Sequence, residues 1–254
     1  MVSLVGEAGL GKTRLVRALL ESARDGPRLV LEGRASPLEA ALPLGVFQDA
    51  IRAERRTRPA TPAPDDPLAA AFPELLLPEL TGERGPDVDR GVLFEGAARY
   101  LRVRCAPTGL VLVLEDLHWA DPGSHALIGH LARTTRDAPI LLALTYRPDE
   151  QPPSQSLDAL RHELARERLG HEVALAPLDD QNVALMLSDI LGVDPDPEAQ
   201  SLIADASGAT PSWSRNSCVT RWSEHRRGSL AHRRPAGAAG DRPGDGLSPG
   251  ARLE

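Results

Sequence analysis

The sequence predicts an α/β fold, a three-layer sandwich in which helices cover both faces of a mainly parallel β-sheet. Apolar runs of strand length alternate along the chain with amphipathic segments of helical length, which is typical of this fold class. One run, GLVLVLED at residues 109–116, is apolar without interruption until two acids close it. Such runs occur in strands that are covered on both faces, as the strands of parallel sheets are.

Five strands are expected, each followed by helical sequence. Proline should break the helical segment LAAAFPELLLPEL at residues 68–80, because it removes a backbone donor and clashes with the preceding turn. Asp121, followed by proline, is expected to cap a helix. The predicted strands span residues 1–5, 28–35, 109–116, 138–147 and 171–178. The predicted helices span residues 12–24, 45–56, 87–105, 122–134, 156–169, 179–192 and 196–207, with a proline-rich linker at 58–67.

Composition limits the classes of protein that this chain can be. The formal net charge of −7 argues against a general nucleic-acid-binding surface, and no helix-turn-helix pattern is present, so no DNA-binding module is expected. Two cysteines are too few for a disulfide framework, and no run approaches about 18 apolar residues. We therefore expect a cytoplasmic protein that has no membrane segment.

The first helix is preceded by a glycine-rich turn that holds the only lysine of the chain. The sequence has 29 lysines and arginines in all, so 28 are arginine. Gly6, Gly11, Lys12 and Thr13 satisfy the pattern G-x-x-x-x-G-K-[ST], in which backbone amides surround a phosphate. A compact ammonium fits against the β and γ phosphates, where a planar guanidinium would be too wide. The predicted nucleotide-binding residues are Gly6, Glu7, Ala8, Gly9, Leu10, Gly11, Lys12, Thr13 and Arg14.

Two acids close the buried strand at residues 109–116. In a phosphate-binding sheet, an acid at the carboxyl end of a strand holds Mg²⁺ through its waters, and a neighbouring acid orients the attacking water. Glu115 and Asp116 occupy these places. The predicted metal-binding residues are therefore Thr13, Glu115 and Asp116, and the predicted cofactors are ATP and Mg²⁺.

Three segments, GEAGLGKTRL, LVLVLEDLHWADPGSHALIGHLAR and LLALTYRPDE, resemble the ATPase domain of the signal-transduction class of AAA-related P-loop NTPases. The resemblance covers about residues 1–211 and is nearest to the origin-recognition-like domains of large LuxR-type regulators and of proteins associated with adenylate cyclase or kinase modules. It implies a five-stranded sheet in the order 5-1-4-3-2. It also implies an ATP-dependent switch with slow hydrolysis.

The resemblance assigns further roles. Lys12 and Thr13 become the Walker A pair, Glu115 the metal-binding acid and Asp116 the water-activating acid. Arg147 resembles the sensor of the γ-phosphate, its alternative being a surface arginine at a strand end. The family more often has Asp at the metal-binding place, so either Glu115 holds the ion one methylene further out or Asp116 takes over that role. We interpret His118 and Trp119 as packing residues beneath the sheet, with nucleotide contact as the alternative.

Both ends of the sequence depart from this family. Family members carry a segment before the first strand that helps to seat adenine, and we expect this segment to be absent here. From Ser207 the chain reads SGATPSWSRNS where the family has a motif like SGGNPFLVEELV, and the loss of one nucleotide from codons for that motif produces these residues. We therefore expect a frameshift after Gly208 and the absence of the C-terminal lid and of a downstream effector domain, while self-association of the chain stays open. The predicted domains are an ATPase core at 1–176, the start of a helical lid at 177–208 and a disordered tail at 209–254.

Three functions remain open from the sequence. The first is an ATP-binding switch domain of a signal-transduction or transcriptional regulator, with possible slow Mg-dependent ATPase activity. The second is a nucleotide-binding module without turnover. The third is a P-loop small-molecule kinase, which needs an arginine-rich lid over a phosphate acceptor. The segment RPDEQPPSQ, which starts at Arg147, carries no such basic cluster.

Overall fold

A computed structural model describes residues 1–57, 65–77, 89–106, 108–148 and 154–191. It contains a five-stranded sheet in the order β2-β3-β4-β1-β5, in which every neighbouring pair is parallel. Read from the other edge, this is the predicted order 5-1-4-3-2, so the P-loop NTPase fold is confirmed. The strands are β1 (Val2–Val5), β2 (Leu29–Arg34), β3 (Leu110–Glu115), β4 (Ile140–Tyr146) and β5 (His171–Ala174).

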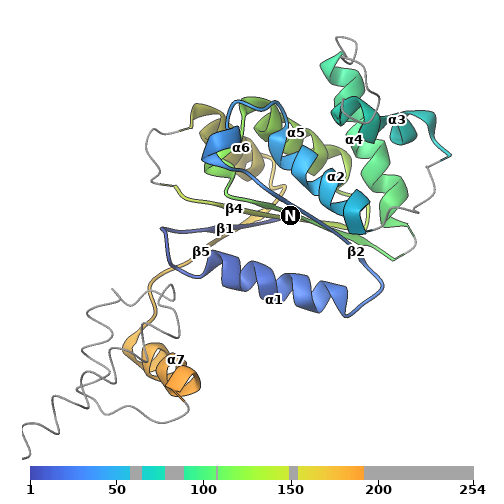
Figure 1. The fold of residues 1–254 in the computed structure, drawn as a ribbon. Helices are drawn as coiled ribbons and strands as arrows, with labels where there is room; N and C mark the ends of the chain where they lie inside the picture. The colour runs from blue at the N-terminus through green and yellow to red at the C-terminus, as the bar shows by residue number, and fades with distance from the viewer. Residues whose placement is uncertain (58–64, 78–88, 107, 149–153, 192–254) are drawn as a thin grey trace, which may run out of the picture.

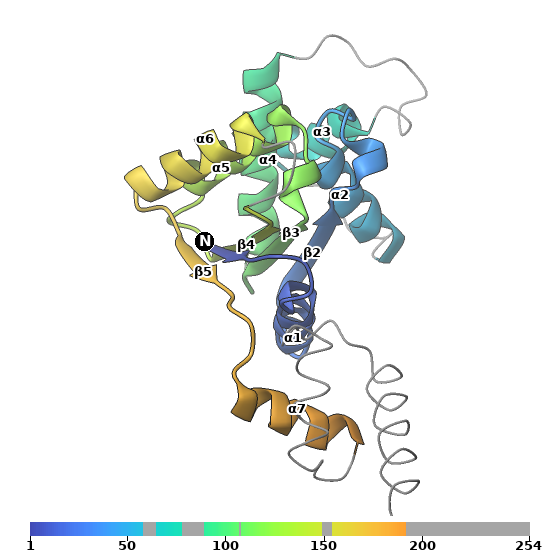
Figure 2. The same cartoon turned by 90° about the vertical axis from the view of Figure 1, so that its left-hand side faces the viewer.

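Helices cover both faces of the sheet, as Figures 1 and 2 show. Helix α1 lies on one face, and α2, α4, α5 and α6 lie over the other. The helices are α1 (Lys12–Arg24), α2 (Gly45–Thr57), α3 (Pro67–Leu76), α4 (Arg90–Cys105), α5 (Pro122–Thr134), α6 (Gln155–Arg166) and α7 (Asp180–Leu191), with short 3₁₀ turns η1 (Pro37–Glu39) and η3 (Leu117–Trp119). None of the helices in this described part of the chain has the length and apolar character needed to span a bilayer.

Strand β3 explains the uninterrupted apolar run in the sequence. All six of its residues are buried, and its side chains alternate between two apolar clusters. Leu110, Leu112 and Leu114 belong to the large cluster under α2, α4 and α5, whereas Val111 and Val113 belong to a smaller cluster with α1. Each such side chain contributes about 1.5–3 kcal/mol when it is buried, so this strand anchors both layers.

Helix α2 packs directly on β2 at a glycine. A Cβ atom added at Gly33 would lie 2.0 Å from the carbonyl oxygen of Val46, which is backbone and cannot rotate away. Only glycine allows this close approach of helix and strand. The contact fixes the end of β2, and therefore Arg34, beside the end of β3.

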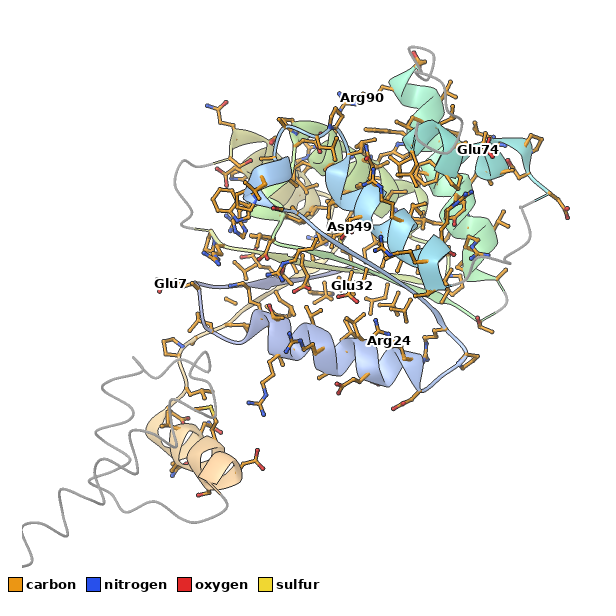
Figure 3. All side chains as sticks on the ribbon, in the orientation of Figure 1. Glu7, Arg24, Glu32, Asp49, Glu74 and Arg90 are labelled. Carbon is orange, nitrogen blue, oxygen red and sulfur yellow. The ribbon has the colours of Figure 1, made fainter. Side chains whose placement is uncertain are left out.

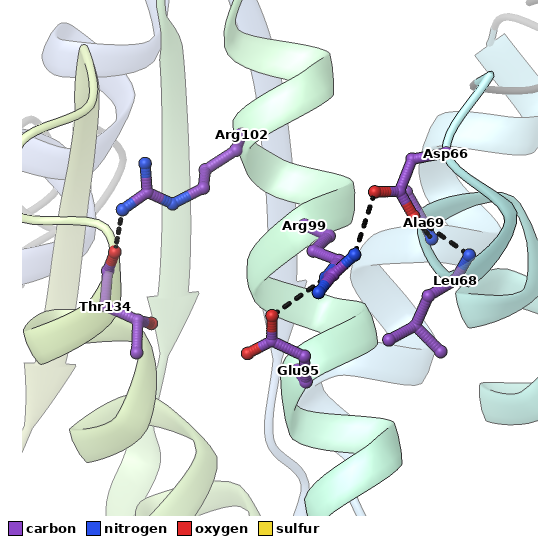
Figure 4. Close-up of polar contacts among 7 residues, drawn as sticks. All are labelled: Asp66, Leu68, Ala69, Glu95, Arg99, Arg102 and Thr134. Carbon is purple, nitrogen blue, oxygen red and sulfur yellow. Dashed lines mark hydrogen bonds and ion pairs between the residues drawn. The ribbon is translucent and has the colours of Figure 1, made fainter.

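Polar contacts join α3, α4 and α5 (Figure 4). The Asp66 carboxylate caps α3 and also accepts a bond from Arg99 on α4, at 3.2 Å. On the next turn of α4, Arg102 donates to the carbonyl of Thr134 at the end of α5. These arginines are partly exposed, so the ion pairs contribute little, and burial of Phe72 and its neighbours carries most of the packing energy.

The predicted break at Pro73 is wrong. Pro73 lies inside α3, which begins at Pro67 behind the Asp66 cap and continues to Leu76. A proline costs a helix one hydrogen bond, but this helix buries Phe72, Pro73 and Leu76, and packing compensates. The other predicted elements differ by a few residues at their ends. The largest such difference is in β5, which stops at Ala174 instead of residue 178. The helix predicted at 196–207 and the tail at 209–254 lie outside the described residues.

Candidate nucleotide-binding site

The turn between β1 and α1 has the backbone that a phosphate-binding loop requires. Gly9 and Gly11 adopt φ values of 87° and 91°, in the left-handed region that glycine enters without strain. Gly11 is the N-cap residue of α1 and has no side chain that could accept a bond from the amides of the first turn. Those amides therefore point out of the helix start, where they and the helix dipole attract an anion.

Lys12 is folded back over this loop. Its side chain is buried, and its Nζ donates to the carbonyl oxygens of Gly6 at 2.6 Å and Glu7 at 2.7 Å. An anion bound in the loop would compete with these carbonyls for the ammonium. The ammonium is therefore held at the loop itself, where a bound phosphate could replace the two carbonyls as its partner.

Glu115 is brought next to Thr13, although the two are far apart in the sequence. Glu115 ends β3 and is 5% exposed. Burial raises the pKa of its carboxyl, the positive charge of Arg34 opposes that shift, and Asp116 and Glu32 add to it. The Thr13 hydroxyl lies close enough to the Glu115 carboxylate to lower this pKa, and both residues line one cavity. A hydroxyl and a carboxylate that line the same cavity are suitable oxygen ligands for a hydrated Mg²⁺.

Asp116 has different partners from Glu115. Its backbone is left-handed, with a φ of 57°, and its N–H donates to the Thr145 hydroxyl on β4 at 3.0 Å. Its carboxylate binds the guanidinium of Arg34, with Nε at 2.8 Å and Nη2 at 2.7 Å from Oδ2. This bond to Asp116 is the main cause of a raised Arg34 pKa. The two neighbouring acids therefore face different groups, Glu115 the hydroxyl of Thr13 and Asp116 a guanidinium.

The remaining predicted site residues lie around the same edge of the sheet. Arg147 directly follows β4, and the register pairs Tyr146 with Val5, so Arg147 lies at the strand end next to Gly6. Arg14 is exposed on α1. His118 and Trp119 lie in η3, beyond the end of β3 instead of beneath the sheet.

The ring centroids of His118 and Trp119 are 5.1 Å apart, and Trp119 packs against the large apolar cluster. This contact supports a packing role for the indole.

Asp121 caps α5 as predicted. Its Oδ2 accepts from the amides of Gly123 at 2.8 Å and Ser124 at 3.2 Å. Its Oδ1 also accepts from the amide of Leu44 at 2.9 Å, and Leu44 has a φ of 56°, which is unusual for a branched residue. The carboxylate therefore joins the β2–α2 connection to the β3–α5 connection, both of which border the candidate site.

A charged cavity of about 280 Å³ opens beside Thr13 and Glu115. It lies along the edge of β2, which pairs only with β3 within the described sheet, and Figure 3 shows Glu32 and Asp49 between α1 and α2 in this region. Three arginines from three elements line it: Arg17 on α1, Arg34 on β2 and Arg56 on α2. The sequence analysis considered a basic cluster only after Arg147. The cluster of three arginines was not predicted, because its members are far apart in the chain.

Two contacts of Asp116, with Arg34 and Thr145, were also missed. A signal for Arg34 was present, since the predicted strand order places the charged end of the second strand beside the acids; the register confirms that Arg34 pairs with Glu115. No sequence pattern around Thr145 indicated that its hydroxyl accepts a hydrogen bond from the Asp116 amide. Within the described residues, no group of three or more His, Cys, Asp or Glu side chains could hold a metal ion by itself. Mg²⁺ at Thr13 and Glu115 would therefore depend on phosphate oxygens and water for its other ligands.

Comparison with known families agrees with this geometry. The family described as the AAA ATPase domain matches residues 1–143, which is more than half of the chain. The chain belongs to the AAA ATPase domain family. The match includes the glycine-rich loop and the strand that ends at Glu115, whereas Thr145 and Arg147 lie just beyond it.

The individual proteins that resemble this chain share little sequence identity with it. A Rhizobium meliloti (strain 1021) protein described as uncharacterized is 26% identical over 217 residues, and the match covers 74% of this chain and 19% of that protein. Among solved structures, Thermotoga maritima RuvB is similar with a TM-score of 0.44 and 16% identity, over 91% of this chain and 56% of that chain. Drosophila ORC bound to DNA gives a TM-score of 0.42 and 13% identity, over 89% and 51%. The chain thus spans about a fifth of the Rhizobium relative and about half of each of these two structures.

Proposed function

We propose that this AAA ATPase domain is an ATP-binding switch with slow Mg-dependent hydrolysis, and that it works in a cytoplasmic signal-transduction or transcriptional regulator. The observation that carries the proposal is that Thr13 and Glu115 line one cavity, beside the loop that holds Lys12. The loop alone is a local motif. The meeting of the loop with a buried carboxylate depends on the pairing of β1, β4 and β3, and it would supply oxygen ligands for a metal beside a phosphate site.

The residues fit ATP and Mg²⁺. The amides from Gly6 to Thr13 and the ammonium of Lys12 would bind the phosphates. Thr13 and Glu115 would hold the ion, and Glu115 is the better metal-binding candidate of the two acids because Asp116 faces Arg34. When bound, Mg²⁺ neutralises charge that develops on the phosphate oxygens. Asp116 would then orient the attacking water, and Arg147 would contact the γ-phosphate from the end of β4.

A second function, binding without turnover, is favoured by one observation. The Asp116 carboxylate is already engaged by the Arg34 guanidinium, and a carboxylate bonded in this way is a poor acceptor for a proton from water. If Arg34 keeps this position in the nucleotide complex, hydrolysis stops and the domain acts only as a nucleotide sensor. If Arg34 moves, hydrolysis is slow but measurable. Phosphate release by the wild-type chain separates these two functions.

The test of binding is the thermal unfolding midpoint of the full chain with and without Mg-ATP, beside the variant Lys12→Ala. A ligand that binds the native state increases the free energy of unfolding, by about 2.7 kcal/mol at a concentration of one hundred times Kd, and so raises the midpoint temperature. We expect a shift in the wild type and almost none in the variant. Equal shifts in both chains would mean that ATP binds elsewhere, and the proposal would be wrong.

The switch role rests on the organisation of the longer relative. Because the similar Rhizobium protein is about five times as long as the matched region, we propose that this domain transmits its nucleotide state to other parts of a longer protein. The partner would be an effector domain or a second copy of the chain. A difference in self-association between the ATP-bound and ADP-bound chain, measured by sedimentation, would support the second arrangement.

A further inference from the structure

A buried imidazole joins the acid-bearing strand to the helix that follows Arg147. His125 lies in the first turn of α5 and is 1% exposed. Its Nε2 is 2.9 Å from the carbonyl oxygen of Leu117, and its Nδ1 is 2.8 Å from the hydroxyl of Ser156 on α6. Both ring nitrogens are therefore used, and each contacts a different connection at the carboxyl edge of the sheet.

The partners determine the tautomer of this ring. A carbonyl oxygen only accepts, so Nε2 must carry the proton and donate to Leu117. Nδ1 is then unprotonated and accepts from the Ser156 hydroxyl. Burial lowers the pKa of His125, with the carbonyl of Leu117 and the carboxylate of Asp121 opposing the shift. The ring consequently stays neutral near pH 7 and keeps one donor and one acceptor.

One partner of His125 directly follows a candidate site residue. Leu117 directly follows Asp116, so the bond to its carbonyl fixes the chain just beyond the acid. Ser156 lies in the first turn of α6, the first helix after Arg147. The amide of Asp116 also donates to Thr145, two residues before Arg147. Two polar contacts therefore hold the chain around Asp116, one from its amide to β4 and one from the Leu117 carbonyl through His125 to α6.

We propose that His125, held by its bond to Ser156, is a positioning residue that fixes Asp116 for ATP hydrolysis. This inference rests on the proposed function, because it concerns the same site. Small displacements of catalytic groups are costly, and a shift of about 1 Å can reduce a rate about a hundredfold. The hydrogen bonds of the ring reach neither the phosphate-binding loop nor the Asp116 side chain. Loss of the ring should therefore lower the rate of hydrolysis and leave ATP binding by the loop nearly unchanged.

The experiment compares two single variants and their double variant. Ser156→Ala removes the hydroxyl that Nδ1 accepts from, and His125→Gln retains a donor for Leu117 but has no group at the position of Nδ1. We expect each to lower kcat for phosphate release by about 5–20-fold with KM for Mg-ATP changed less than about twofold. If both act by breaking the same bond, the double variant should be no slower than the slower single variant.

Thr135→Val is the matched control. Thr135 is also buried beside α5, at the other end of the helix, and its hydroxyl donates to the Leu131 carbonyl at 2.7 Å. The change removes a hydroxyl hydrogen bond, and Ser156→Ala removes the half-buried bond to His125 together with a 3.3 Å contact to the Ser154 hydroxyl, so both should lower the unfolding midpoint. Only Ser156→Ala should lower kcat. Equal kcat values in the two variants would assign a purely structural role to His125 and overturn the proposal.

The outcome also separates this proposal from the function on which it rests. A wild-type chain that releases no more phosphate than Lys12→Ala would contradict turnover, and the positioning role with it. A wild-type chain that turns over, with a double variant whose rate loss is the product of the two single losses, would contradict the positioning role alone. Nitrogen-15 chemical shifts of the His125 ring provide a direct check, since the proposal requires a neutral ring with its proton on Nε2; any other form would overturn it.

Discussion

The two halves of the candidate site are built in different ways. The loop half lies within a few residues of chain, between Val5 and the start of α1, and its internal bonds from Lys12 are to its own carbonyls. The acid half combines the ends of β2, β3 and β4, because Asp116 binds Arg34 and Thr145. The loop is thus a local device for binding, whereas the acid half depends on the register of three strands.

This difference separates affinity from turnover. Changes in the loop should abolish nucleotide binding, because the amides and the ammonium supply most of the contact with the phosphates. Changes in the acid half should act on the metal and on the rate of hydrolysis. The following variants test that separation in order of expected effect.

Lys12→Arg should give the largest effect although it keeps the charge. The planar guanidinium cannot occupy the space in which the ammonium meets the carbonyls of Gly6 and Glu7. We expect the affinity for Mg-ATP to fall at least about a hundredfold, or about 2.7 kcal/mol, as measured by calorimetry. The matched control is Arg24→Lys, the reverse exchange at an exposed position in the last turn of the same helix, which should change the affinity less than about twofold. Near-equal affinities for all three chains would show that the loop does not select an ammonium.

Glu115→Gln should give an intermediate effect that depends on the metal. The amide keeps the shape of the side chain but removes the charge that faces Thr13. We expect the affinity for ATP in the presence of Mg²⁺ to fall roughly tenfold, and the affinity measured in excess chelator to change little. A comparable loss without Mg²⁺ would show that Glu115 supports the loop and does not bind the ion.

Arg34→Gln should raise the rate of hydrolysis, whereas the two preceding changes lower the affinity for ATP. Removing the guanidinium releases the Asp116 carboxylate to act on water. We expect kcat for phosphate release to rise by about 3–10-fold. Arg17→Gln is the control, since Arg17 lines the same cavity and has no ion-pair partner in the described part of the chain. A fall in kcat for Arg34→Gln alone would mean that Arg34 itself assists catalysis.

The smallest effect is on the stability of the nucleotide-free chain. Burial raises the pKa of Glu115, so the folded chain holds this proton to a higher pH than the unfolded chain does. The contribution of the carboxyl to stability is therefore complete below its unfolded pKa and is lost as pH rises through the raised folded pKa. Glu115→Gln avoids this loss and should raise the unfolding midpoint by a few degrees at about pH 8, but not near pH 4. A lower midpoint for the variant at pH 8 would contradict the assignment.

The sequence predicted the local half of the site more completely than the distant half. The glycines and Lys12 could be read from one motif, because the loop requires certain residue types at fixed spacing. The burial of β3 could be read from its apolar run. The pairing of Arg34 with Asp116 needed the strand order, and the support from Thr145 needed the register as well. No local pattern encodes either contact.

Two further features show why packing overrides local rules. Pro73 remains inside α3 because the helix buries that face against its neighbours, although a proline in isolation ends a helix. Leu44 holds a left-handed backbone because its amide bonds to Asp121, which lies 77 residues later in the chain. In both cases a contact with a distant residue decides the conformation, and single-sequence reasoning has no access to that contact.

The central claim is that the loop from Gly6 to Thr13 binds the phosphates of ATP. The most direct measurement is a crystal structure of the chain with Mg²⁺ and a non-hydrolysable ATP analogue. The account predicts phosphate density inside the loop, with Nζ of Lys12 moved from the carbonyls of Gly6 and Glu7 to the phosphate oxygens. An analogue bound elsewhere, with Nζ still on those two carbonyls, would contradict it.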